Sequence, residues 1–192
     1  MQHIHINPRP QMFLLWLQIQ STAQTQQSTT KTTRNHSKNL KMVDKALFSS
    51  NSGEWQTPLT LFKKLNKEFD FYLDPCTTTD NPLHTPLFYT KEDNGLEQDW
   101  FGTAFVNPPY NQEISKWLFK AYHEFTKTPL IKNIVFLLPV RTDTKWFHQY
   151  IYNEQTHNFY PHIEVRFIKG RLKFGNSKNS APFPSMLVVF NR

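Results

Sequence analysis

Five consecutive apolar residues, Ile134-Val135-Phe136-Leu137-Leu138, constrain the fold more than any other part of the sequence. A strand with one face in water alternates apolar and polar side chains, whereas this run has no polar position and ends at Pro139. Such a run is typical of a strand buried on both faces, as in the parallel sheet of an α/β domain. The run therefore predicts a sheet whose two faces are both covered.

A second apolar stretch, Ala104-Phe105-Val106, is followed directly by the tetrapeptide Asn107-Pro108-Pro109-Tyr110, here called the NPPY loop. Asn111 is expected to cap the helix that comes next, because asparagine is a favoured N-cap residue. The apolar side chains of that helix recur at helical spacing, at Ile114, Trp117, Leu118, Ala121 and Phe125. The pattern predicts a strand, an exposed loop and an amphipathic helix in succession.

The remaining elements are predicted from local patterns. Thr57 as N-cap and Pro58 as first helical residue open an earlier helix with apolar residues at Leu61, Phe62, Leu65 and Phe69. A further helix is expected over 142–152, and strands are expected over 71–73, 87–90, 163–168, 171–174 and 185–190. This order predicts an open α/β fold, with a mostly parallel sheet that ends in a C-terminal antiparallel hairpin.

The first 41 residues differ from the rest. Ser21 to Ser37 is dominated by Ser, Thr and Gln, which cannot bury enough apolar surface to offset the entropy of ordering, so 1–41 is predicted to be a disordered extension. Met12 to Ile19 is apolar but too short to span a bilayer, and it resembles a signal peptide only weakly. We favour translation from Met42, with one organised domain over 42–192.

Composition narrows the classes of partner and site. The formal net charge of +7 favours a polyanion such as nucleic acid, although a basic protein without such a partner has the same charge. Cys76 is the only cysteine, so the chain forms neither an internal disulfide nor a cysteine zinc cluster. The eight His residues include no HExxH pair, and no metal site is expected.

The NPPY loop has the chemistry that methylation of an exocyclic amine requires. The lone pair of such an amine is delocalised into the base ring, and two acceptors that hold its N–H groups out of the plane restore its nucleophilicity. The amide oxygen of Asn107 and the carbonyl of Pro108 are candidates for these acceptors. Pro108 and Pro109 fix φ and stiffen the loop, and Tyr110 offers a face on which a flipped base can stack. The alternative is a rigid turn in which the asparagines only cap.

A series of motifs in fixed order accompanies the loop. It comprises Glu54-Trp55-Gln56-Thr57-Pro58, Leu73-Asp74-Pro75-Cys76, Gly95-Leu96 with Asp99-Trp100, the NPPY loop, Leu138-Pro139-Val140-Arg141-Thr142-Asp143, Gly170-Arg171-Leu172-Lys173-Phe174 and Ala181-Pro182-Phe183-Pro184-Ser185. This series resembles the phage-type DNA N6-adenine methyltransferase family over residues 47–190. The resemblance implies a Rossmann-like, S-adenosylmethionine-dependent methyltransferase fold and transfer of a methyl group to adenine in DNA.

The resemblance also implies a set of cofactor-binding residues. Trp55, Thr57 and Pro58 match a motif that lies against the cofactor. Asp74, at the end of a strand, can pair with the cofactor ammonium group or cap a loop. The turn after it has Cys76 where many methyltransferases have glycines. Cys76 is expected to be a small packed residue, because no activating histidine is indicated nearby. Asp99 can accept a hydrogen bond from the cofactor or lie in a surface turn.

The C-terminal half has a basic character that suits a DNA backbone. Arg141, Lys145, Arg171 and Lys173 are candidates for phosphate contacts, and a solvated turn is the alternative for Arg171. Double-stranded DNA is the expected partner, no membrane is expected, and the expected location is the cytoplasm of a bacterial host, from a phage or prophage gene. The sequence specifies neither an oligomeric state nor a DNA recognition sequence.

Two other functions are compatible with the same residues. NPPY also serves enzymes that methylate RNA bases or protein glutamine, so the tetrapeptide alone indicates only a planar nitrogen. A non-catalytic nucleic-acid-binding module of the same fold would suit the glycine-poor turn after Asp74. The net charge and the family resemblance favour methylation of DNA.

Overall fold

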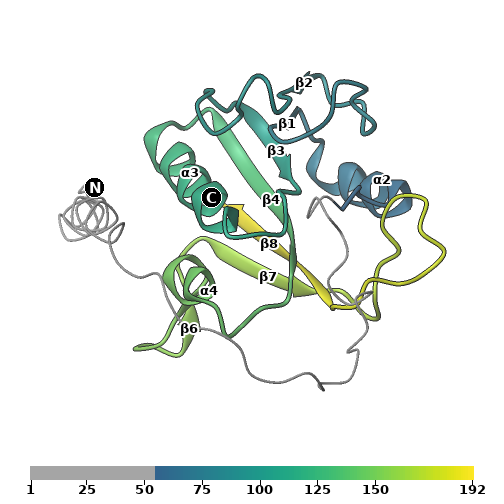
Figure 1. Ribbon diagram of the computed structural model, residues 1–192. Helices are drawn as coiled ribbons and strands as arrows, with labels where there is room; N and C mark the ends of the chain where they lie inside the picture. Colours follow the sequence, from purple (N-terminus) through teal and green to yellow (C-terminus); the bar gives the residue numbers. More distant parts are fainter. Residues whose placement is uncertain (1–54) are drawn as a thin grey trace, which may run out of the picture. The chain divides into compact units, whose positions relative to one another are not determined.

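The computed structural model describes residues 55–192, and Figure 1 shows their arrangement. The predictions of a disordered extension over 1–41 and of translation from Met42 lie outside these residues. The helices are α2 (Leu59–Phe69), α3 (Ile114–Lys127) and α4 (Lys145–Tyr150). The strands are β1 (Leu73–Asp74), β2 (Leu87–Phe88), β3 (Gly102–Val106), β4 (Ile131–Pro139), β5 (Tyr152–Asn153), β6 (Asn158–Phe159), β7 (Ile163–Phe167) and β8 (Ser185–Asn191).

Six of the strands form one sheet, in the order β2-β1-β3-β4-β8-β7. β2, β1, β3 and β4 run parallel to one another, and β8 is antiparallel to both β4 and β7. β7 therefore runs in the same direction as β4, and β8 is the one reversed strand of this sheet. The prediction of an α/β fold with a mostly parallel sheet is confirmed. β5 and β6 pair separately as a small antiparallel ribbon that the sequence patterns did not predict.

The C-terminal hairpin differs from its prediction. β7 and β8 are antiparallel neighbours, but residues 168–184 separate them, so no tight turn joins the two strands. The strand predicted over 171–174 is wrong, because this segment leaves the sheet. Phe174 and Ala181 are buried among apolar side chains of α2 and β4. Ala181 N–H donates to the Leu172 carbonyl over 2.7 Å. Burial of single apolar residues, not strand pairing, holds this segment.

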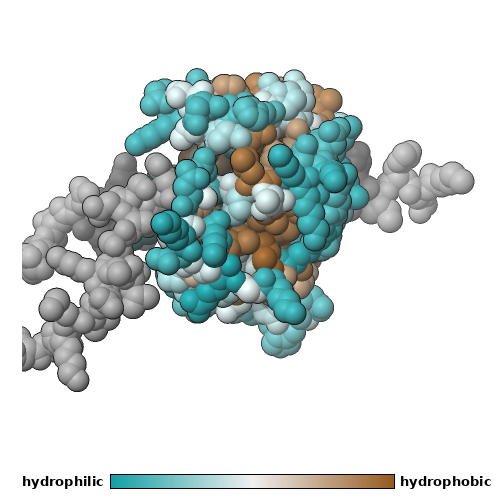
Figure 2. All heavy atoms as spheres, turned by 90° about the vertical axis from the view of Figure 1, so that its right-hand side faces the viewer, coloured by the Kyte–Doolittle hydropathy of each residue, from teal (hydrophilic) through white to brown (hydrophobic). Residues whose placement is uncertain are grey.

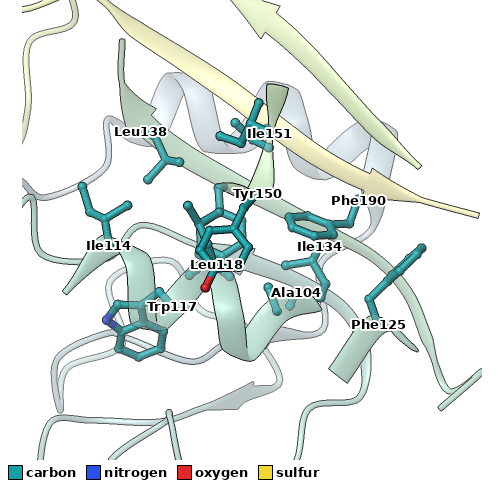
Figure 3. Close-up of a cluster of buried hydrophobic side chains, with 14 of the residues drawn as sticks. Ala104, Ile114, Trp117, Leu118, Phe125, Ile134, Leu138, Tyr150, Ile151 and Phe190 are labelled. Atoms are coloured by element: carbon teal, nitrogen blue, oxygen red, sulfur yellow. The ribbon is translucent and has the colours of Figure 1, made fainter. Parts of the chain in front are cut away.

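The predicted buried strand is β4. Its residues Ile134 to Leu138 are all fully buried. Their alternation divides the core into two layers. Ile134, Phe136 and Leu138 pack in one cluster with residues of α3, α4 and β8, part of which Figure 3 shows. Val135 and Leu137 pack in the other, with α2 and the segment 168–184. Helices therefore cover both faces of the sheet, as the apolar run requires.

The helices begin later than their predicted caps. The N-cap of α2 is Pro58 and that of α3 is Glu113, and neither makes a side-chain cap bond. Asn111 still accepts from Glu113 N–H over 2.7 Å, in a turn directly before α3. The predicted helix over 142–152 is shorter, since α4 spans Lys145–Tyr150. Thr57 does not cap α2 because its hydroxyl has another partner, described below.

Candidate active site

The candidate site lies at the side of the sheet where the parallel strands have their carboxyl-terminal ends. β1, β3 and β4 are parallel, so the residues that follow them meet at one edge, where open α/β sheets bind ligands. A cleft of about 740 Å³ opens there. Its wall contains seven of the residues predicted from sequence, namely Trp55, Thr57, Asp74, Cys76, Asn107, Pro108 and Pro109. These residues come from the turn before α2, the end of β1 and the end of β3.

The side chain of Asn107 is fixed from one side only. Its amide nitrogen donates to the Trp55 carbonyl over 2.5 Å and to the Thr57 hydroxyl over 2.9 Å. A backbone carbonyl can only accept, so the nitrogen must face Trp55 and the amide orientation is determined. The amide oxygen is buried and has no hydrogen-bond partner among the described residues. Asn107 therefore presents an unused acceptor whose position is set by two hydrogen bonds.

The two prolines complete this part of the wall. Pro108 is buried, and within residues 55–192 no hydrogen bond to its carbonyl oxygen is found. Asn111 N–H donates to the carbonyl of Pro109 over 2.9 Å, which closes the loop before α3. The Pro108 carbonyl is thus a second free acceptor, adjacent in sequence to Asn107. A buried polar group without a partner is costly in a folded protein, and a ligand donor removes that cost.

Tyr110 lies behind the cleft wall, not in it. Its hydroxyl donates to the Leu137 carbonyl over 3.1 Å, and burial raises the pKa of the phenol. Its ring stands 6.4 Å from that of Trp55, 6.0 Å from Phe174 and 5.6 Å from Phe183, centroid to centroid. We call these four residues the aromatic cluster. The cluster ties the NPPY loop to the turn before α2 and to the segment 168–184.

Asp74 ends β1 with its carboxylate in the cleft wall and only 4% of its surface exposed. One carboxylate oxygen accepts from Cys76 N–H over 3.2 Å. Burial raises the pKa of Asp74 to about 7, because the ionised form loses its hydration, and hydrogen bonds from Cys76 and Thr77 offset this only in part. Among the described residues no cation pairs with it. A cationic ligand group would favour its ionised form.

Cys76 packs against the core layer that contains Ile134, Phe136 and Leu138, and it also lines the cleft. Burial, and then the charge of Asp74, raises the pKa of its thiol, while the backbone N–H of Asn107 opposes this. The thiolate is therefore scarce at neutral pH, and this environment suits the small packed residue expected from the sequence. A nucleophilic cysteine requires the opposite shift.

Of the remaining predicted cofactor residues, Thr57 lines the cleft, whereas Pro58 and Asp99 do not. Thr57 is buried, and its hydroxyl accepts from Asn107 instead of capping α2, which corrects its predicted capping role. Pro58 caps α2 and is not in the wall. Asp99 also lies outside the wall: its carboxylate pairs with Lys127 over 2.9 Å, and its side chain is 63% exposed. Its surroundings match the surface turn, the second of its two predicted roles, and Trp100 beside it is fully buried.

The predicted DNA-contacting side chains are exposed at the same edge. Arg141 and Lys145 follow the end of β4, while Arg171 and Lys173 lie in the segment 168–184 between β7 and β8. None of the four forms an ion pair with another of the described residues. Figure 2 shows the side of the molecule that carries α2 and this segment: apolar side chains gather at its centre and hydrophilic ones flank them.

Several residues of the cleft were not predicted as site residues, because most lie in loops without a periodic pattern and Trp117 was predicted only as part of the apolar stripe of α3. They come from the turn after β1, the loop after β2 and the start of α3: Pro75, Thr77, Thr78, Asp80, Lys91, Asn94, Gly95, Leu96, Glu113 and Trp117. Pro75 and Gly95-Leu96 belong to the ordered motifs, and these motifs were the available signal.

Gly95 lies against the backbone of Pro75, and a Cβ at position 95 would stand 1.9 Å from the Pro75 carbonyl oxygen. We expect Gly95→Ala to lower the free energy of unfolding by about 2 kcal/mol or more, since backbone must move. Gly170→Ala is the control: no atom lies within 4 Å of that Cβ, although φ is +81°. Strain alone there costs about 1 kcal/mol. Equal losses in urea unfolding would contradict a special role for the close approach.

Between Trp55 and Arg192 no group of His, Cys, Asp and Glu side chains could hold a metal ion. In the same range no helix is both long and apolar enough to cross a membrane.

The chain is similar to known proteins over nearly all of its described part. The family model for DNA N-6-adenine-methyltransferase (Dam) matches residues 45–192. A DNA N-6-adenine-methyltransferase of Haemophilus phage HP1 (strain HP1c1) is 30% identical over 155 residues, which cover 79% of this chain and 82% of the phage protein. The putative methyltransferase YfdM of Escherichia coli (strain K12) is 42% identical over 65 residues, 30% of this chain and 70% of that protein.

The family resemblance predicted from the ordered motifs is confirmed by these matches. The chain belongs to the DNA N-6-adenine-methyltransferase family, and its activity is methylation of adenine N6 in DNA.

Proposed function

We propose that the cleft is where S-adenosylmethionine meets a flipped adenine, and that the NPPY loop holds the adenine amine for transfer. The described domain is then a Rossmann-like, S-adenosylmethionine-dependent methyltransferase. Two features support this: helices cover both faces of a mostly parallel sheet, and the cleft opens at the carboxyl ends of its strands. A base must leave the duplex to enter such a cleft.

The observation that carries the proposal is the free amide oxygen of Asn107. It is buried, it has no partner among the described residues, and the hydrogen bonds to Trp55 and Thr57 prevent the amide from rotating to use it elsewhere. A turn-forming asparagine would satisfy its oxygen locally, which was the alternative left open by the sequence. The adenine amine has two N–H groups, and the oxygens of Asn107 and Pro108 are available to accept them.

The residues present also suit the cofactor. S-adenosylmethionine supplies, when bound, a methyl group on a positively charged sulfur. Its ammonium group is the cation that the buried carboxylate of Asp74 otherwise lacks within the described residues. Trp55, Thr57 and Cys76 line the same cleft and are proposed cofactor neighbours. Asp99 is not proposed, because it pairs with Lys127 outside the wall.

The chain contributes position and polarity to the reaction. Asn107 and Pro108 draw the two N–H groups out of the base plane, which returns the lone pair to the amine nitrogen. Bound S-adenosylmethionine would supply the methyl group to this nitrogen, which Asn107 and Pro108 would hold in position. Trp55, the member of the aromatic cluster that lines the cleft, is proposed to stack against the base, and Tyr110 stacks behind Trp55 and supports it.

Duplex DNA is the proposed partner at the edge around the cleft. Arg141, Lys145, Arg171 and Lys173 are exposed there and are proposed to contact phosphates on either side of the target base. We propose the cytoplasm of a bacterial host as the place of action, since a relative that matches over most of the chain is a phage enzyme.

The test supplies the purified protein with methyl-labelled S-adenosylmethionine and duplex DNA, RNA or a protein mixture. We expect label in DNA only, recovered after digestion as N6-methyldeoxyadenosine. Label in RNA or in glutamine would point to those alternatives. A non-catalytic DNA-binding module would incorporate no label and give no heat when titrated with the cofactor. Transfer should fall steeply between 50 and 200 mM salt if several phosphates are contacted, as is usual for DNA-binding proteins.

A further inference from the structure

The segment between β7 and β8 has two buried positions, Phe174 and Ala181, and an exposed tip between them. The Phe174 ring lies 5.2 Å from that of Trp55, and the Phe183 ring lies 5.0 Å from it, centroid to centroid. Ala181 N–H donates to the Leu172 carbonyl over 2.7 Å and closes the loop. Residues 175–180, here called the tip, follow Phe174 directly and are all exposed. Figure 1 draws the tip within the yellow loop at the right-hand side.

The tip has a defined backbone. Gly175 has a φ of +53° and its N–H donates to the Gln56 carbonyl over 2.8 Å. Ser177 N–H donates to the Phe174 carbonyl over 3.1 Å. The Ser177 hydroxyl donates to the Asn179 carbonyl over 3.0 Å and accepts from Asn179 N–H over 3.2 Å. Four hydrogen bonds therefore fix the backbone of the six tip residues, and the contacts of Phe174 and Phe183 with Trp55 anchor the segment on either side of the tip.

The side chains that remain free in the tip suit base edges. Asn176, Lys178 and Asn179 make no side-chain hydrogen bond or ion pair to another described residue, and the tip has no acidic or apolar residue. A carboxamide can donate to and accept from one base edge at once, as asparagine does with N6 and N7 of adenine. Lysine can donate to O6 and N7 of guanine.

The tip is also linked to the cleft. Gln56, to which it is bonded, lines the cleft between Trp55 and Thr57, the two partners of Asn107. Lys169, Arg171 and Lys173, which precede the tip, are exposed cations suited to phosphates. Phosphate contacts set the position of a protein on DNA, whereas sequence is read by groups that reach the bases. The segment offers both kinds of group, with the carboxamides at its end.

We propose that the tip reads the bases beside the target adenine, and that Asn176 and Asn179 determine the sequence preference of the enzyme. The proposal rests on the proposed function, in which the adenine enters the cleft at the NPPY loop. The tip is fixed to the wall of that cleft, so its side chains lie at a constant offset from the target base. A short tip of this kind reads few base pairs.

The experiment maps methylated adenines in a DNA library treated with the wild-type protein and with Asn176→Ala/Asn179→Ala. We expect the wild type to favour particular flanking bases and the double variant to lose that preference at one or more positions by roughly 10-fold. Two controls accompany it. Asn158→Ala, in β6, should leave the pattern unchanged. Arg171→Ala/Lys173→Ala should weaken methylation at all sites alike and reduce its salt dependence.

Three outcomes would overturn the proposal. The first is a flanking-base pattern in the Asn176→Ala/Asn179→Ala variant that equals the wild type's. The second is wild-type methylation of adenine without any flanking preference, which leaves the proposed function intact. The third, an absence of N6-methyladenine with the wild type, removes the proposed function as well. Thermal melts identify a folding defect, and Asn176→Gln, which keeps the carboxamide but displaces it, then provides the second variant.

Discussion

Asn107→Ala is expected to lower the rate of methyl transfer by roughly 10²- to 10³-fold or more, because it removes one of two acceptors that activate the amine. The substitution also leaves the Trp55 carbonyl and the Thr57 hydroxyl without their donor. Single-turnover assays with saturating DNA and cofactor measure the chemical step, and calorimetry measures cofactor affinity separately. We expect the affinity to change far less than the rate.

A graded series makes this test sharper. Thr57→Val removes one of the two hydrogen bonds that orient Asn107 but leaves its oxygen in place, so a smaller loss of roughly 10-fold is expected from imperfect positioning. Asn158→Ala changes the same residue type in the β5–β6 ribbon and should have no effect on transfer. Wild-type turnover in Asn107→Ala would show that the acceptor role assigned to this residue is wrong.

Asp74→Asn is expected to weaken binding of S-adenosylmethionine by roughly 10- to 100-fold at pH 8, since a charge-assisted hydrogen bond becomes a neutral one. The pKa of Asp74 is raised to about 7, so wild-type affinity should fall as the pH decreases from 7.5 to 5.5. The cofactor amine, with a reference pKa of about 7.7 to 8.0, becomes more protonated as the pH falls, so a loss of affinity reports the carboxyl of Asp74 and not the amine. The fall is expected to be roughly 10-fold or more and to be absent in the variant.

Without cofactor, the carboxyl of Asp74 should change the stability of the protein with pH in the opposite direction to cofactor affinity. The pKa is higher in the folded protein, about 7, than the reference value of 3.8, so the folded state binds the proton more strongly. The stabilisation is complete below pH 4 and is lost as the pH rises through 7, by up to about 4 kcal/mol. Asp74→Asn should therefore unfold at a higher temperature than the wild type at pH 8.

Tight, pH-independent cofactor binding by the wild type would refute the pairing of Asp74 with the ammonium group of the cofactor.

The sequence predicted those parts of the fold that depend on local patterns. The apolar run Ile134 to Leu138 is enough to identify a strand buried on both faces, because no half-exposed strand tolerates it. The stripe from Ile114 to Phe125 likewise identifies α3. Caps were less predictable: Thr57 has the chemistry of an N-cap, but a donor from Asn107, 50 residues away, takes its hydroxyl. Competition between a local and a distant partner is decided by the tertiary structure.

The site divides in the same way. The NPPY loop and Asp74 were predicted because each follows a strand, and strand ends meet at one edge of a parallel sheet. The contacts of Phe174 and Phe183 with Trp55 were not predicted, because these two residues have no spacing that indicates their partners. Asp99 was ambiguous for a related reason, since its partner Lys127 lies on another element.

The position of β8 has a consequence for how the chain is made. β8 follows the other described strands in the sequence, yet it pairs with β4 on one side and with β7 on the other. A ribosome therefore releases β4 and β7 before the strand that joins them exists, and β4 presents an unpaired apolar edge during synthesis. Such edges invite pairing with other chains, so the nascent protein should be prone to aggregation until β8 emerges. Chaperone dependence during expression is the expected sign of this late closure.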